Sequence, residues 1–235
     1  MLVRSMLFVI LLPAVVAAED LAAFLNAATE AVRPKAAVRA FGKAVTTSPD
    51  GSTEDEIAVV RKDGSLYLEL RKARTRVLIL DSGKEAFISE GGGKSAPFAL
   101  DTQLGTTPFT REDLHPFDTA RYVAPRISDL GPYDLTATLE PKPSQYALIV
   151  MTFERQRKLP TKTLYYKDAP NNLTKMRQDG EFAAVGDAFL PGNISMQEFQ
   201  LRAKTTFTLK WEAAEAPAGI LERAGLDETS PVVWP

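Results

Sequence analysis

Few residues in this sequence have the types and the spacing that catalysis or metal binding requires. The 235 residues contain no cysteine and a single histidine, His115. Disulfides, thiol catalysis and thiolate zinc sites are therefore excluded, as is any site that needs two histidines. His115 stands between Leu114 and Pro116 with no nucleophile spaced to act with it. We expect it to have a structural or surface role.

Two other segments resemble ligand-binding motifs but do not meet their requirements. Residues 91–95 read Gly-Gly-Gly-Lys-Ser, like the end of a phosphate-binding loop, but Ile88 stands where the first glycine is needed. Pro97 also blocks the helix that must follow, so we expect a flexible hairpin tip. The acidic run 54–56 lacks the glycine and the spacing of a calcium loop and is interpreted as a solvated turn.

Basic residues are frequent on neighbouring predicted strands. They are Arg61, Lys62, Arg71, Lys72, Arg74 and Arg76. Hairpin pairing could gather them into a patch that attracts anionic lipid head groups or an acidic partner. The alternative is a solvated outer face balanced by acidic neighbours. With 28 basic against 30 acidic residues, the chain gives no general reason to expect nucleic acid as a partner.

Residues 1–18 have the layout of a secretory signal peptide. Arg4 supplies the positive charge, an uncharged run of 13 residues follows from Met6, and Val16 and Ala18 occupy the small-residue cleavage positions. A membrane-spanning helix would need about 20 residues. A secreted chain without cysteine is common in the bacterial periplasm. We therefore expect an exported protein that is soluble in the periplasm after cleavage.

The spacing of apolar residues predicts one leading helix and then a long series of strands. The helix covers residues 19–32, and Pro34 ends it or begins a second short segment to Ala44. The Asp-Gly pairs at 63–64 and 179–180 predict hairpin turns. The predicted strands are 57–62, 65–71, 76–80, 85–89, 133–140, 146–154, 161–166, 173–178, 181–185, 192–202 and 205–212.

The segment 97–143 holds seven of the sixteen prolines and cannot be regular sheet throughout. We expect loops there with one short helix near 110–114, for which Thr110 is the N-cap. The tail 213–235 is small, polar and proline-bearing, with a short helix expected at 220–224. Because no repeat or linker divides the chain, we expect one domain over residues 19–212.

The two faces of the predicted strands differ in polarity. Leu66, Leu68 and Leu70 share one face, and Ile149, Met151 and Phe153 share another. The opposite faces are mostly polar, as an antiparallel sheet with one wet face allows. A sheet of about ten such strands curls. Its apolar concave face fills with side chains, packs a helix, or leaves a cavity for an apolar ligand.

Four segments in order carry a family resemblance. They are the charged strand pair 57–71, the run Thr-Pro-Phe-Thr-Arg-Glu-Asp-Leu at 107–114, the run Leu-Glu-Pro-Lys-Pro at 139–143 with Tyr146 and the strand ending at Leu159-Pro160, and the strands 192–202 and 205–212. Together they resemble the outer membrane lipoprotein-sorting protein family of the LolA/LolB-like superfamily. The resemblance implies a mainly β fold with a few helices. The fold is a half-open curled antiparallel sheet, or incomplete barrel, closed by the N-terminal helix and a proline-rich helical lid.

The resemblance also implies a periplasmic carrier whose apolar interior shelters acyl chains. Its ligand would be a lipid, an acylated lipoprotein or another amphiphile, and its partner an inner-membrane exporter or another envelope protein. Such a carrier needs no covalent step, cofactor or metal, and each buried methylene contributes about 0.8 kcal/mol. The expected cavity-lining residues are Leu66, Leu68, Leu70, Phe87, Ile149, Met151 and Phe153, with Phe109 and Leu114 on the lid. Ordinary core packing is the alternative for each.

Two other functions stay open. In the second hypothesis the chain is a non-catalytic interaction module of a cell-envelope or lipid-export complex, in which the sheet packs solid and a surface patch binds a partner. The third is a hydrolase with scattered carboxylates, which are usually distant in a sequence. A filled interior favours the interaction module, whereas a hollow interior favours the carrier. A polar cleft that contains two acidic residues with perturbed pKa values would favour the hydrolase.

Overall fold

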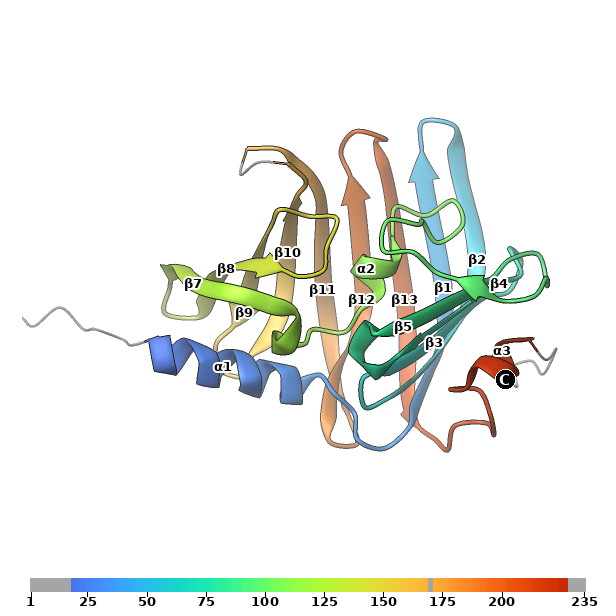
Figure 1. Ribbon diagram of the computed structural model, residues 1–235, viewed down its shortest axis with the longest axis horizontal. Helices are drawn as coiled ribbons and strands as arrows, with labels where there is room; N and C mark the ends of the chain where they lie inside the picture. The colour runs from blue at the N-terminus through green and yellow to red at the C-terminus, as the bar shows by residue number, and fades with distance from the viewer. Residues whose placement is uncertain (1–17, 169–170, 228–235) are drawn as a thin grey trace, which may run out of the picture.

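A computed structural model describes residues 18–168 and 171–227 (Figure 1). The predicted signal peptide therefore lies outside the described residues, apart from Ala18. The helices are α1 (Ala18–Ala31), η1 (Asp81–Gly83), α2 (Arg111–Leu114), η2 (Thr119–Arg121) and α3 (Arg223–Asp227). The strands are β1 (Val38–Ser48), β2 (Gly51–Lys62), β3 (Ser65–Leu70), β4 (Thr75–Leu80), β5 (Glu85–Ser89), β6 (Ala96–Pro97), β7 (Tyr122–Leu130), β8 (Asp134–Pro141), β9 (Leu148–Glu154), β10 (Leu159–Tyr166), β11 (Leu173–Val185), β12 (Ala188–Glu198) and β13 (Ala203–Ala213). No helix in this described part of the chain is long and apolar enough to cross a membrane.

All thirteen strands form one antiparallel sheet in the order β6-β5-β4-β3-β2-β1-β13-β12-β11-β10-β9-β8-β7. The chain runs from the centre to one edge, restarts at the other edge, and returns until β13 pairs with β1 along ten residue pairs. The sheet curls but ends at β6 and β7 rather than closing (Figure 1). The predicted fold class, a mainly β protein built on a curled half-open sheet, is confirmed.

The main core fills the concave face of the sheet. The apolar stripe of α1, formed by Leu21, Leu25 and Ala28 and continued by Val32 just after the helix, is buried against it, as the helical spacing predicts. Phe24 of α1 meets Phe153 of β9 edge to face, with ring centroids 5.7 Å apart. The proline-rich segment between β6 and β7 also enters this core, through Phe98, Leu104, Phe109, Leu114 and Phe117.

A second, smaller core lies on the opposite face of β2 to β5. Tyr67 and Leu78 are buried there beneath Ile220 and Leu226 of the C-terminal segment. This face of β3, opposite Leu66, Leu68 and Leu70, is therefore not the solvated face expected of such a sheet, because the C-terminal segment folds back over it. Helix α3 begins at Arg223, three residues later than predicted.

Three strands were not predicted from the sequence, namely β1, β7 and the two-residue β6. Strand β1 has small residues at Ala40, Gly42 and Ala44, so its pattern carries little apolar signal. Gly42 is required there, because a Cβ would lie 1.7 Å from the carbonyl oxygen of Thr208 on β13. Strand β7 contains Pro125, which an edge strand tolerates because it needs no ladder hydrogen bond on its outer side.

The predicted hairpin turn at Asp179-Gly180 is wrong. Strand β11 continues through both residues, and Gly180 pairs with Asn193. Asp179 is not a turn residue because its carboxylate is held by Arg177, with Nε and Nη2 at 2.7 and 2.8 Å from its two oxygens. The chain instead reverses at Gly186, whose φ is +62°. Strand β12 accordingly begins at Ala188 rather than at Gly192.

Candidate functional site

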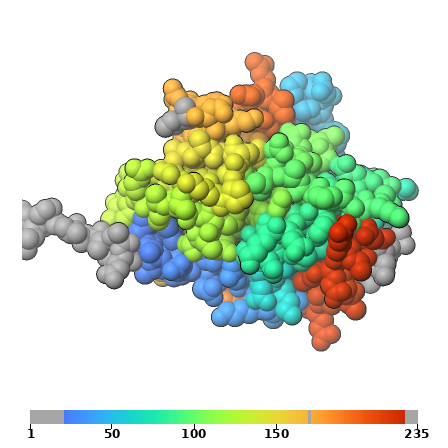
Figure 2. All heavy atoms as spheres, in the orientation of Figure 1, coloured from blue at the N-terminus to red at the C-terminus, as the bar shows by residue number. Residues whose placement is uncertain are grey.

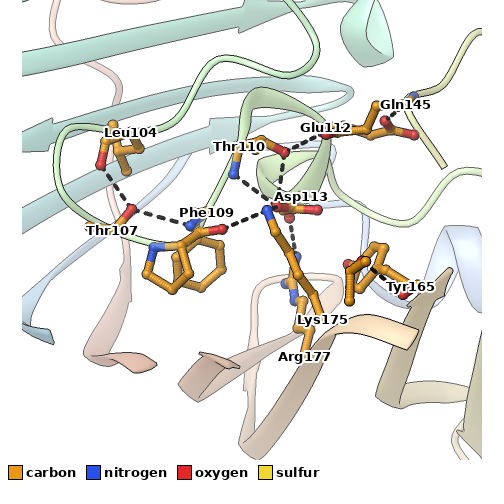
Figure 3. Close-up of polar contacts among 12 residues, drawn as sticks. Leu104, Thr107, Phe109, Thr110, Glu112, Asp113, Gln145, Tyr165, Lys175 and Arg177 are labelled. Atoms are coloured by element: carbon orange, nitrogen blue, oxygen red, sulfur yellow. Dashed lines mark hydrogen bonds and ion pairs between the residues drawn. The ribbon is translucent and has the colours of Figure 1, made fainter. Parts of the chain in front are cut away.

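Residues 98–121, here called the lid, cover the concave face of the sheet. A compact turn shapes its tip: Leu104 N donates to Phe109 O at 2.8 Å, and Thr107 Oγ1 donates to Leu104 O at 2.8 Å (Figure 3). The turn directs Phe109 inward, where its ring stacks on Phe207 of β13 with centroids 4.5 Å apart. The lid therefore contributes aromatic side chains directly to the core.

Helix α2 is only four residues long and depends on its cap. Thr110 N and Oγ1 donate to the same oxygen of Asp113, Oδ2, at 2.8 and 2.9 Å, which completes a capping box. The short helix with Thr110 as N-cap is the one the sequence predicts. Because the helix is so short, side chains from neighbouring elements must hold it in place.

Asp113 is the centre of a buried polar cluster that ties the lid to the sheet. Lys175 Nζ of β11 lies 3.0 Å from Asp113 Oδ2 and 2.7 Å from Pro108 O, and Tyr146 Oη donates to Asp113 Oδ1 at 2.8 Å. Arg177 Nη1 donates to Asp113 O at 2.6 Å. Burial, followed by the negative charge of Asp113, raises the pKa of Tyr146, which keeps its proton for this hydrogen bond.

Glu112 holds the other side of α2. Its carboxylate accepts hydrogen bonds from Ser144 Oγ and, at 3.0 Å, from Gln145 N, and it lies 3.7 Å from Arg121 Nη2. Burial raises the pKa of Glu112 against the opposing effect of these hydrogen bonds. Gln145 Nε2 also donates to Thr110 Oγ1 at 2.8 Å (Figure 3). The lid is thus held by β11 on one side and by the β8–β9 loop on the other.

A cavity of about 70 Å³ lies beneath the lid. Strand β3, strand β13 and the lid form its apolar wall. The residues are Leu66 and Leu68 of β3, Phe207 and Leu209 of β13, and Phe109, Leu114 and Phe117 of the lid. A second cavity of about 40 Å³ is lined by Ile149 and Met151 of β9. Both are far smaller than the roughly 300 Å³ at which ligand pockets begin, so in this conformation side chains fill most of the interior.

One end of the larger cavity is charged. Arg61, Arg177 and Asp179 line it. Arg61 Nη2 donates to Val32 O at 2.9 Å, while its Nε is buried without a hydrogen-bond partner among the described residues. Burial, with a smaller contribution from the charge of Arg177, lowers the pKa of Arg61 to about 10, so it stays charged at neutral pH. The cavity therefore has an apolar body and a cationic corner.

The structure places the nine sequence-predicted residues in four groups. Leu66, Leu68, Phe109 and Leu114 line the larger cavity, and Ile149 and Met151 line the smaller one. Leu70 and Phe153 belong to the same core. Phe87 does not: it packs in the second core, with the Arg223 guanidinium 4.6 Å from its ring centroid. Alternation along β5 puts Ala86 and Ile88 inward and Phe87 outward, which corrects the expectation.

The charged end of the cavity was missed from the sequence. Arg61 was grouped with the basic residues of a solvated or docking surface, yet it follows Ile57 and Val59 at period two and shares their inward face. This period-two spacing could have indicated from the sequence that Arg61 points inward. Arg177 and Asp179 share the inward face of β11, and the incorrect turn at 179–180 concealed it.

Comparison with known proteins supports the fold. No family model and no curated protein matches the sequence. One solved structure is described as a putative outer membrane lipoprotein-sorting protein domain from Vibrio parahaemolyticus. It has a TM-score of 0.73 at 13% identity, and the match covers 87% of this chain and 98% of that chain. A LolA superfamily protein from Nitrosomonas europaea has a TM-score of 0.68 at 14% identity, with the same coverage of both chains. A DUF1329 family protein from Desulfovibrio piger has a TM-score of 0.73 at 10% identity, again with that coverage. The resemblance seen in the sequence is therefore confirmed at the level of structure: this chain has the fold of the LolA superfamily and of outer membrane lipoprotein-sorting domains.

Proposed function

We propose that this chain is a periplasmic carrier or binding protein for a lipid, an acylated lipoprotein or another amphiphile. The observation that carries the proposal is the apolar cavity under a separately anchored lid, on the concave side of a half-open sheet. The acting unit is the domain over residues 19–212, after removal of the signal peptide. Acyl chains are sheltered without covalent chemistry.

The proposed ligand requires the lid to move. The cavity of about 70 Å³ is too small for an acyl chain, so uptake of such a ligand needs a conformation in which the lid lies further from the sheet. Displacing Phe109, Leu114 and Phe117 would join the space they now fill to the cavity beneath. Each methylene that then enters contributes about 0.8 kcal/mol, which offsets the burial that the lid side chains lose when they move outward.

The charged corner suits an amphiphile rather than a plain hydrocarbon. Arg61 has an unpartnered Nε within the described structure, and Arg177 is held in place by Asp179. A carboxylate or ester oxygen at the polar end of a ligand could accept a hydrogen bond from Arg61 while the chain lies against Leu66 and Leu68. The lining thus matches a molecule with one polar and one apolar end.

Uptake of a dansyl-labelled fatty acid tests this function. The wild-type protein is expected to enhance the fluorescence of the probe, and Leu66→Trp is expected to abolish the enhancement because the indole fills the cavity. Leu201→Trp is the matched control, since Leu201 is 53% exposed in the β12–β13 connection, away from the lid. Thermal unfolding checks that both variants fold. A folded wild-type protein without uptake, and without lipid by native mass spectrometry, would contradict the carrier function.

The alternative is a non-catalytic interaction module of a cell-envelope or lipid-export complex. The largely filled interior favours it, as do Leu130 and Tyr133, which are 45% and 80% exposed at the edge formed by β7 and β8. Lack of probe uptake by the folded protein would favour this alternative. Its partner would be an inner-membrane exporter or another envelope protein.

A further inference from the structure

A cleft of about 390 Å³ lies between the lid, the β4–β5 turn and the residues that follow β8. Its walls include Lys84, Arg111, His115, Arg121 and Lys142. Its volume falls in the range of small-molecule sites, about 300 to 1,000 Å³, whereas that of the interior cavity does not. In Figure 2 the green lid and the teal β4–β5 region lie side by side on the face toward the viewer.

The cleft carries an excess of positive charge. Among the residues that the structure describes, neither Lys84 nor Lys142 has a carboxylate within ion-pair distance, and both are exposed. Asp118 on the cleft wall is already paired with Arg33, at 2.6 Å. Asp81 at the rim is the other acidic residue of the lining, so four cations face two carboxylates. Asp118 is engaged by Arg33, and Arg121 lies 3.7 Å from Glu112 behind the wall, which leaves Lys84, Arg111 and Lys142 against Asp81.

The buried wall of the cleft has polar atoms in fixed positions that lack partners. Arg111 is oriented by two backbone carbonyls, with Nη1 donating to Phe98 O at 2.8 Å and Nη2 to Gly83 O at 2.7 Å. In the described part of the chain, Nε of Arg111 and Nδ1 of His115 are buried without a hydrogen-bond partner. His115 as a whole is only 6% exposed. Unpaired buried polar atoms are uncommon. A guanidinium has five N–H groups, and the two carbonyls engage one N–H on each Nη of Arg111, so further Nη donors remain for an anion in the cleft.

Electrostatics at His115 agree with this geometry. Burial, followed by the charges of Arg121 and Arg111, lowers the pKa of His115 to about 2. The imidazole is therefore neutral at physiological pH and keeps one N–H to donate. The positive field that disfavours an imidazolium also attracts an anion.

We propose that this cleft binds the phosphate group of a phosphomonoester or phosphodiester. Arg111 and Arg121 offer planar N–H donors, and Lys84 and Lys142 add mobile ammonium groups at the entrance, a combination that matches phosphate oxygens. The phosphate belongs either to a lipid head group or to a soluble ester. The site acts independently of acyl-chain binding in the interior, so it stands or falls apart from the carrier function.

Calorimetric titration at low salt tests the site with two probes, glycerol 3-phosphate and dihexanoyl phosphatidic acid. The variant K84Q/K142Q removes two exposed charges from the entrance and is expected to weaken binding about tenfold. K204Q/K210Q makes the same change at two exposed lysines of β13 and is expected to stay within about twofold of the wild-type protein.

The two probes also separate the sources of the phosphate. Tight binding of glycerol 3-phosphate that K84Q/K142Q loses indicates a soluble ester, whereas binding confined to the phosphatidic acid and lost in that variant indicates a lipid head group. The proposal is overturned if the wild-type protein binds neither probe. It is equally overturned if K84Q/K142Q binds as the wild type does, or if K204Q/K210Q weakens binding to the same extent.

Discussion

Lys175 Nζ lies 3.0 Å from Asp113 Oδ2, and this buried ion pair joins the lid to strand β11. Removing one member of such a pair leaves an uncompensated charge in the interior. We expect Lys175→Met to lower the free energy of unfolding by about 3 kcal/mol. Urea denaturation measures the loss.

Two variants serve as controls for this prediction. Lys43→Met breaks an ion pair with Glu54 on the surface, and we expect the free energy of unfolding to stay close to that of the wild-type protein. Asp113→Asn combined with Lys175→Met removes both charges, and we expect it to be more stable than Lys175→Met alone. Equal losses for Lys175→Met and Lys43→Met would show that the buried pair does not anchor the lid.

Phe109 joins the lid to the sheet through its stack on Phe207. We expect Phe109→Ala to destabilise the protein by about 3 to 5 kcal/mol, the usual cost of deleting a buried aromatic ring. Differential scanning calorimetry should show a lower Tm. Tyr133→Ala, at a side chain that is 80% exposed, should change the Tm little. An unchanged Tm for Phe109→Ala would mean that the lid does not cover a continuous core.

The alternation of residue types in the sequence was sufficient to predict most of the sheet. It placed Leu66 and Leu68 inward, and likewise Ile149 and Met151, because period two is a property of the strand itself. The alternation did not determine which side chains of β5 point to the concave side of the sheet, because both faces of this strand carry apolar residues. Phe87 is covered by the C-terminal segment, which is far away in the sequence.

Charged residues account for what sequence reasoning missed in the site. Alternation puts Arg61 and Asp179 on the inward face of their strands, but their burial there depends on the lid and on Val32 O, which accepts a hydrogen bond from Arg61. Such tertiary partners leave no local signal, whereas the cap at Thr110 does, since Asp113 stands three residues later. The helix of the lid was therefore predicted and its charged surroundings were not.

His115 gives the folded state a defined pH dependence. Its pKa falls from about 6.5 in the unfolded chain to about 2 in the folded one, mainly through burial, so the unfolded chain binds the extra proton as pH decreases. The contribution of the neutral His115 to the stability is fully present above pH ~6.5 and is lost progressively as the pH falls below this value. We expect a loss of about 2 kcal/mol between pH 7 and pH 5 from this residue.

Urea denaturation of the wild-type protein and of His115→Gln at pH 7, 6 and 5 measures that contribution. His115 is the only histidine, so no other imidazole titrates in this range. The difference in stability between the two proteins should therefore shrink as the pH falls from 7 to 5. A difference that stays constant would show that folding does not change the pKa of His115.

Gly83 lies directly against the imidazole of His115, with no room for a side chain between them. Its φ is +94°, and a Cβ at this position would lie 1.8 Å from His115 Cε1. Gly83→Ala therefore adds a steric clash to the cost of an unfavourable backbone conformation, and we expect it to destabilise the protein by more than about 2 kcal/mol. Gly91→Ala is the matched control, because Gly91 also has a positive φ, +62°, but no atom within 4 Å of its would-be Cβ. The excess loss of Gly83→Ala over Gly91→Ala, measured by urea denaturation, reports the contact with His115.

Because His115 and Gly83 both line the basic cleft, Gly83→Ala should also weaken phosphate binding, while Gly91→Ala should not. Equal stability of the two variants would mean that the imidazole moves aside without cost.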